Sequence, residues 1–142
     1  MTPSISTTLE TLRASLAANS SSNVFIGAPD PAEPGLYVFP IYHGISPALR
    51  SIPTGPATHP RRPGFSLECL LLAEPGGDFD AIDEGASFIQ MHPILDIDGA
   101  TARLIVSDQS PDEAANIFLA AGIPYRLYIH FRIRIEPAPP GS

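Results

Sequence analysis

The sequence predicts an α+β domain built on a single, mostly antiparallel sheet that packs with about three helices. Three observations support this class. Apolar residues recur at helical spacing in three segments, runs of aromatic and β-branched residues lie between them, and the last run alternates apolar and polar residues over twelve positions. The resulting order is one helix, three strands, then helix, strand, helix and strand, which is typical of α+β domains.

The first helix is predicted from Ile5, Leu9, Leu12 and Leu16, which recur at intervals of four, three and four residues. This spacing places all four side chains on one face of a helix. Asn19 and the serines after it end the segment. We therefore expect an amphipathic helix with one buried face.

Two strands and a long loop follow this helix. Val24–Ile26 suits a short strand, and Gly35–Tyr42 is a clearer one because it is rich in aromatic and β-branched residues. Pro40 has no N–H group to donate, so this strand is expected at a sheet edge or with a bulge there. The next segment, His43–Pro63, contains five prolines. Loops of about twenty residues are usually functional or ordered only on binding.

Phe65–Ala73 is predicted to be a core strand, because it is apolar on both faces from Cys69 onward. Asp78 is suited to cap a helix that runs to about Met91, where His92-Pro93 stops it. The expected buried stripe of this helix consists of Phe79, Ile82, Ala86 and Ile89.

Thr101–Val106 is predicted to be a further short strand. The segment Ser110-Pro111-Asp112-Glu113 combines a capping serine, a first-turn proline and a capping-box glutamate, so it predicts a helix start. The helix is expected to run to Ala121, with Gly122 as its stop.

The final strand, Tyr125–Glu136, has the clearest pattern in the sequence, because its residues alternate with a period of two. The expected core face carries Tyr125, Leu127, Ile129, Phe131, Ile133 and Ile135. The expected solvated face carries Arg126, Tyr128, His130, Arg132, Arg134 and Glu136. The sheet is therefore predicted to be open, with one wet face that bears arginines.

Length and composition indicate one folded domain. The 142 residues suffice to bury a core, and 44% hydrophobic with 16% charged residues argues against wholesale disorder. We expect the domain to span residues 1–136 and a proline-rich tail to span 137–142. No long apolar run and no secretory-signal pattern occurs, so a cytoplasmic protein is expected. The single cysteine, Cys69, excludes an internal disulfide and a Cys-cluster zinc site.

The charge inventory is acidic overall and contains arginine as the only cationic residue. A net charge of −7 argues against nucleic acid as the main partner, because phosphate binding needs clustered positive charge. All eight cations are arginines. This usage fits either a GC-rich genome or a preference for ion pairs at protein interfaces.

No pattern in the sequence points to catalysis. The four histidines, His43, His59, His92 and His130, have no metal-ligand spacing, although a site in the long loop would involve His43 and His59. The acidic residues after Gly77 suit a helix N-terminus, and Asp96 to Gly99 suits a turn. Cys69 is expected to be a buried, inert thiol. We therefore expect no catalytic residue, no metal and no cofactor.

Surfaces remain as candidate functional features. The arginines of the long loop and of the last strand either pair with carboxylates of the same chain or face an acidic partner. On the second interpretation the candidate protein-interface residues are Arg50, Arg61, Arg62, Arg126, His130, Arg132 and Arg134.

Several motifs together resemble a known family. After the amphipathic first helix come Leu36-Tyr-Val-Phe-Pro-Ile-Tyr and Ser46-Pro-Ala-Leu-Arg50. Met91-His-Pro-Ile-Leu95 follows the acidic helix, and Gly122-Ile-Pro-Tyr-Arg126 leads into the closing strand. In order and spacing, these pieces resemble the N-terminal domain of the cap, or tail-terminator, protein of contractile injection systems of the virulence-cassette and antifeeding-prophage type.

The resemblance implies a non-enzymatic protein that forms a homo-hexameric ring on the distal end of the tube and sheath. Such a ring would end polymerisation and anchor the last sheath layer. The implied partners are the inner-tube protein and the sheath protein, and the implied location is the assembled particle. The identity of any membrane-attachment component is left open.

Two alternatives remain from the sequence alone. The chain is then either another structural, baseplate-type component of the same particle, or a small ligand-binding or enzymatic domain that uses the segment His43–Pro63. Alanine at His43 and His59 would abolish ligand binding in the last case and do little in a cap.

Overall fold

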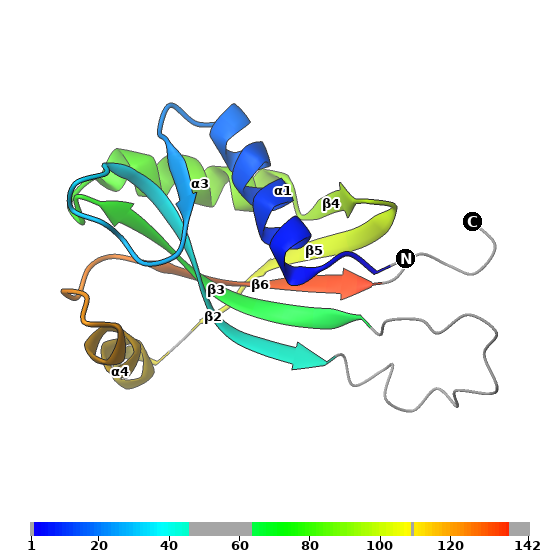
Figure 1. Ribbon diagram of the computed structural model, residues 1–142. Coiled ribbons are helices and arrows are strands. Elements are labelled where there is room, and N and C mark those ends of the chain that lie inside the picture. Colours follow the sequence, from blue (N-terminus) through cyan, green and yellow to red (C-terminus); the bar gives the residue numbers. More distant parts are fainter. Residues whose placement is uncertain (1, 46–63, 109, 137–142) are drawn as a thin grey trace.

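The computed structural model describes residues 2–45, 64–108 and 110–136 (Figure 1). Three helices and six strands occur in these residues, and they confirm the α+β class. In chain order the elements are α1 (Ile5–Ala18), β1 (Val24–Ile26), β2 (Gly35–Ile45), β3 (Phe65–Glu74), α3 (Phe79–Met91), β4 (Ile94–Ile97), β5 (Ala100–Val106), α4 (Pro111–Ala121) and β6 (Ile129–Glu136).

The strands form one sheet in the order β1-β2-β3-β6-β5-β4. Among the described strands only β1 and β2 pair in parallel, so the mostly antiparallel prediction is confirmed. β3 lies between β2 and β6, and residues Cys69 to Ala73 are all buried. The apolar character of β3 on both faces therefore reflects its central position, as expected.

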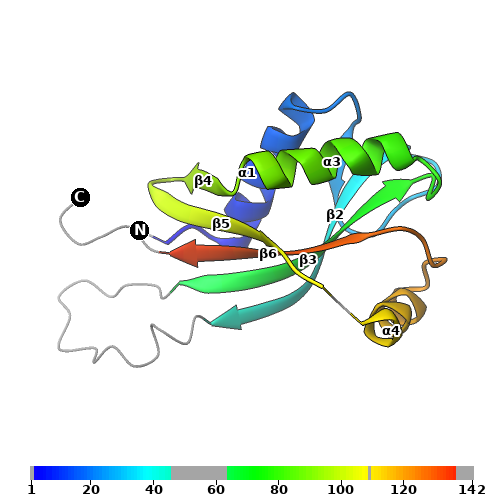
Figure 2. The same cartoon turned by 180° about the vertical axis from the view of Figure 1, so that it is seen from behind.

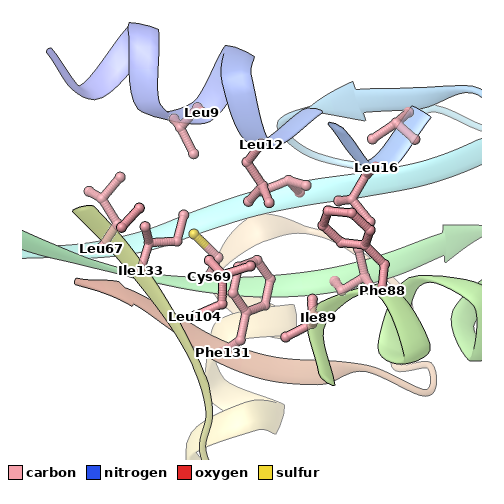
Figure 3. Packing of buried hydrophobic residues seen from close by; sticks show 14 of the residues in the cluster. Leu9, Leu12, Leu16, Leu67, Cys69, Phe88, Ile89, Leu104, Phe131 and Ile133 are labelled. Atoms are coloured by element: carbon pink, nitrogen blue, oxygen red, sulfur yellow. The ribbon is translucent and has the colours of Figure 1, made fainter. Parts of the chain in front are cut away.

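The two faces of the sheet are covered differently. α1 and α3 lie together on one face, whereas α4 lies against one end of the other face (Figures 1 and 2). The larger core is packed between the sheet and the first two helices, as Figure 3 shows. Its members there include Leu9, Leu12, Leu16, Leu67, Cys69, Phe88, Ile89, Leu104, Phe131 and Ile133.

α1 behaves as the sequence predicts. Ser4 caps it by accepting a hydrogen bond from the Thr7 N–H at 3.0 Å, and Leu9, Leu12 and Leu16 are buried. The caps of α4 are also confirmed, because the Ser110 Oγ accepts from the Glu113 N–H and Gly122 adopts a left-handed conformation with φ 69°.

The buried stripe of α3 differs from the predicted one. Asp78 caps the helix as expected, and Ile82 and Ile89 are buried, but Phe79 is 61% exposed and Ala86 only half-buried. The buried residues are Ala81, Ile82, Gly85, Phe88 and Ile89. Phe79 lies six residues before Gly85, the middle of this stripe, which at 100° per residue turns its side chain about 120° away from the sheet.

One strand boundary and one additional strand also differ from the prediction. β2 continues to Ile45, so the expected loop does not begin at His43. Ile94–Ile97 forms a strand that the sequence did not predict, joined to β5 by a tight turn in which Asp98 and Gly99 have positive φ. The turn itself was expected. The bulge expected at Pro40 is present, since the β2–β3 register shifts between Pro40 and Tyr42.

No helix in the described ranges has the length and apolar character needed to span a membrane.

Candidate protein-interaction surface

α1 and α3 cover one face of the sheet, and α4 covers only one end of the opposite face, so the rest of that opposite face has no helix on it. Residues paired directly across neighbouring strands point to the same face. On the face away from α1 and α3, Tyr37, Leu70 and Leu72 pack with Phe118 of α4. The rest of this face we call the open face. It carries Tyr42, Gly44, Ser66, Glu68, Ile94, Asp96, Thr101, Arg103, Ile105, Arg132, Arg134 and Glu136.

Three arginines lie side by side at the centre of the open face. Arg103 of β5 is the direct cross-strand partner of Arg134 of β6. Arg132 precedes Arg134 by two residues on β6 and therefore points to the same face. Like charges in direct cross-strand positions repel each other. Glu136 offsets this repulsion, because its Oε1 lies 3.4 Å from the Arg103 Nε and 3.9 Å from the Arg134 Nε.

The third arginine has its own carboxylate. The Arg132 Nη2 donates to the Glu68 Oε1 of β3 at 3.3 Å. The side chains of all three arginines are between 44% and 47% exposed, whereas that of Glu68 is 25% exposed. Ion pairs this exposed contribute about 0–1 kcal/mol each, so the guanidinium groups remain available to a partner.

His130 differs from its expected solvated position. Its side chain is only 6% exposed, because its cross-strand neighbour Leu70 belongs to the layer packed with α4. The Ser107 Oγ lies 2.5 Å from the His130 Nδ1. The His130 Nε2 lies 3.6 Å from the Glu68 Oε1 and has no hydrogen-bond partner within the described residues. His130 of β6 thus lies between Ser107, which follows β5, and Glu68 of β3.

Arg126 also lies elsewhere than expected. β6 begins at Ile129, so Arg126 belongs to the preceding segment and not to the polar face of a strand. Its Nη1 donates to the Ala73 backbone oxygen at 2.8 Å and to the Glu74 Oε2 at 2.7 Å. Its side chain is 10% exposed, and that of Glu74 is 13% exposed. The structure therefore offers little of Arg126 or of His130 to a partner protein.

The alternating pattern starts at Tyr125, but β6 starts only at Ile129, so the first four residues of the pattern are not in a strand. Tyr125 and Leu127 were expected in the core but are exposed. The Tyr125 ring contacts the Phe118 ring of α4 at a tilted angle and meets the Tyr128 ring edge to face. The period of two thus holds in β6 itself, where Phe131, Ile133 and Ile135 are buried.

Several expected site residues lie outside the described residues. These are Arg50, Arg61, Arg62 and His59, together with most of the expected loop. His43, which was expected in that loop, lies on β2 and its ring packs at 5.5 Å from the Phe65 ring. His92 ends α3, where its Nδ1 lies 3.1 Å from the Phe88 oxygen and its ring stacks on Phe88.

Two solved structures share this architecture. The first is described as the "PVC sheath/tube terminator in extended state" of an extracellular contractile injection system, with a TM-score of 0.74 at 15% identity. The second, the "anti-feeding prophage cap (AFP tube terminating cap)", has a TM-score of 0.67 at 14% identity. The matches cover 100% and 99% of this chain. The chain has the fold of these tube terminators.

The comparison confirms, at the level of the fold, the resemblance drawn from the motifs. The chain spans 62% and 60% of the two terminator chains, so it corresponds to about three fifths of each. No protein-family model and no curated protein sequence matches the chain. On this terminator fold, the open face is the exposed surface on which the predicted interface residues Arg132 and Arg134 lie.

We also searched the titratable groups of the described residues for a metal site. The described residues contain no group of three or more His, Cys, Asp and Glu side chains placed to hold a metal ion. Cys69 is fully buried. Burial, with a smaller contribution from the nearby Glu68 charge, raises the pKa of its thiol to about 12.

We predict that Cys69 does not react with iodoacetamide while the protein is folded. The thiolate is the reactive form, and a pKa near 12 leaves almost no thiolate at pH 8. Labelling followed by mass spectrometry should be more than about 100-fold slower than in concentrated urea, where the thiol regains a pKa of about 8.5. Similar rates in the two conditions would contradict the buried position.

Proposed function

We propose that this protein is a cap, or tube terminator, of a contractile injection system. The observation that carries the proposal is the structural match of 100% and 99% of this chain to two proteins described as a tube terminator and a tube-terminating cap. The motif resemblance, which rests on the sequence and not on the fold, supports the same function.

The proposed working form is a homo-hexameric ring seated on the distal end of the inner tube and the sheath. It ends their polymerisation and anchors the last sheath layer. A ring of this kind uses one surface of each subunit against a different surface of the next, so that the contact closes on itself. Its partners are then the inner-tube protein, the sheath protein and further copies of the chain.

We propose a structural and not a catalytic role, because the solved chains that share this fold are described as a terminator and a cap. The protein accordingly acts within the assembled particle. The residues that matter on this proposal are surface residues, above all Arg132 and Arg134 of the open face.

The proposal predicts that loss of the protein removes control over tube length. Particles purified from a strain that lacks the gene should show tubes and sheaths of irregular length by electron microscopy. Adding purified protein to polymerising tube protein should restore short, uniform tubes, and a labelled protein should decorate one end only.

Tubes and sheaths of normal length and stability in the deletion strain would overturn the proposal. Labelled protein at the end that carries the baseplate would also overturn it, and would assign the chain to the baseplate-type role.

A further inference from the structure

Positive charge is concentrated on one surface within the described part of the chain. Of the five arginines there, Arg13 is bound by Glu10 and Arg126 by Glu74. The other three, Arg103, Arg132 and Arg134, all lie on the open face. All 15 acidic residues are also described, so the remaining described surface is predominantly acidic. The open face is therefore the surface least repelled by an acidic partner.

The open face also has the composition of a contact surface. Tyr42, Ile94 and Ile105 are exposed around the arginines, and they are the direct cross-strand neighbours of Glu68, Arg103 and Arg132. Arginine and tyrosine are enriched where proteins contact each other. The acidic groups on this face are engaged locally, since Glu68 and Glu136 hold the arginines and the Asp96 Oδ1 accepts the Gly99 N–H.

The opposite side of the molecule has the complementary charge. α3 crosses the sheet on the side away from the open face (Figure 2), and its sequence contains no basic residue. Asp80 and Asp83 are exposed on α3, and Glu84 beside them accepts hydrogen bonds from the Ser21 N–H and hydroxyl. On neighbouring α1, Arg13 is already neutralised by Glu10. We call this surface the acidic helical face.

We propose that the open face of one copy docks on the acidic helical face of the next copy, with Arg132 and Arg134 opposite Asp80 and Asp83. A second copy is the occupant because the chain itself presents both complementary surfaces, on opposite sides of the sheet. Contacts of this heterologous kind propagate head to tail, and they close into a ring when the rotation between neighbouring subunits permits it. The closure into a hexamer rests on the proposed function, whereas the pairing of the two faces is tested separately.

The test uses two charge-reversed variants of the full chain. The open-face variant is Arg132→Glu with Arg134→Glu, and the helical-face variant is Asp80→Arg with Asp83→Arg. Wild-type protein should self-associate in sedimentation-velocity runs, more weakly as salt increases. Each variant alone should associate at least about 10-fold more weakly, because like charges then meet at the contact.

Two controls separate charge pairing from damage to the fold. The first control is Glu33→Arg with Asp112→Arg, which changes the net charge as much as the helical-face variant does. Both residues are exposed and lie outside the open face and the acidic helical face, so this variant should associate like wild type. Because Arg132→Glu brings a carboxylate next to Glu68, the neutral variant Arg132→Gln with Arg134→Gln should weaken association to an intermediate extent at an unchanged urea midpoint.

Mixing the two reversed variants supplies the decisive measurement. The acidic open face of one variant then meets the basic helical face of the other, and the two unaltered faces also match. Equal amounts should therefore recover wild-type association as an alternating assembly with an even number of subunits. A wild-type protein that stays monomeric at all concentrations, variants that associate normally, or a mixture that fails to recover would each overturn the pairing.

The outcome is distinguishable from a failure of the proposed function. If the wild type controls tube length but the mixture does not recover association, the pairing of faces is wrong and the terminator role stands. If the mixture recovers association but deletion of the gene leaves tube length unchanged, the pairing stands and the terminator role is wrong.

Discussion

Replacing Phe131 with alanine is expected to lower the free energy of unfolding by about 3–5 kcal/mol. Phe131 is 0% exposed and lies on the central part of β6, between Cys69 of β3 and Val106 of β5. Its ring fills the space between the sheet and the helices α1 and α3 (Figure 3). The rigid strands around it cannot collapse into the cavity that alanine would leave. Urea denaturation followed by circular dichroism measures the loss.

Phe79→Ala is the matched control. The same group of atoms is removed, but Phe79 is 61% exposed at the start of α3, so the change should stay within about 0.5 kcal/mol. Equal losses for Phe79→Ala and Phe131→Ala would contradict the buried stripe of α3 that the structure shows.

These two phenylalanines also mark how far the sequence predicts the fold. The strict alternation around Phe131 identifies its face, because a strand has only two faces and one of them must be apolar. Phe79 was placed in the core by its spacing from Ile82, yet the helix begins at Phe79 itself. The direction of a first-turn side chain depends on how the helix is rotated against the sheet, which spacing alone does not determine.

Elements that depend on partners far along the chain were missed or misplaced. Ile94–Ile97 is only four residues long and becomes a strand because β5 pairs with it after a tight turn. Tyr125 is exposed although its ring contacts Phe118 of α4, and His130 is buried beside Leu70, which packs with Phe118. Sequence periodicity predicts that a strand has a polar face, but not that a helix covers one end of that face.

The candidate surface was predictable only in part. Arg132 and Arg134 follow from alternation within one strand, whereas Arg103 joins them only through the register between β5 and β6. Its own strand, Ala100–Val106, alternates only from Ala100 to Leu104 and then continues with two exposed apolar residues, so the pattern alone does not bring Arg103 next to Arg134. The exposed Ile94 and Ile105 join the same surface through the same pairing.

Replacing Arg126 with alanine is expected to destabilise the protein by about 3 kcal/mol, because it leaves a nearly buried carboxylate without its cation. The Arg126 Nη1 bridges the Glu74 carboxylate and the Ala73 oxygen at the end of the central strand β3, and its Nε lies 3.3 Å from the Pro124 oxygen. One side chain therefore holds the segment before β6 against the end of β3. Thermal or urea unfolding measures the effect.

Arg13→Ala is the control, since the Arg13–Glu10 pair lies on the surface of α1 and its loss should leave the unfolding midpoint almost unchanged. The comparison also separates two roles for arginine in this chain. If Arg126→Ala weakens assembly, the weakening should be in proportion to the lower stability of the variant. The double variant Arg126→Ala with Glu74→Ala should then recover part of the stability and part of the assembly. Arg132 and Arg134 should instead change assembly at constant stability. An Arg126→Ala variant as stable as wild type would contradict this division.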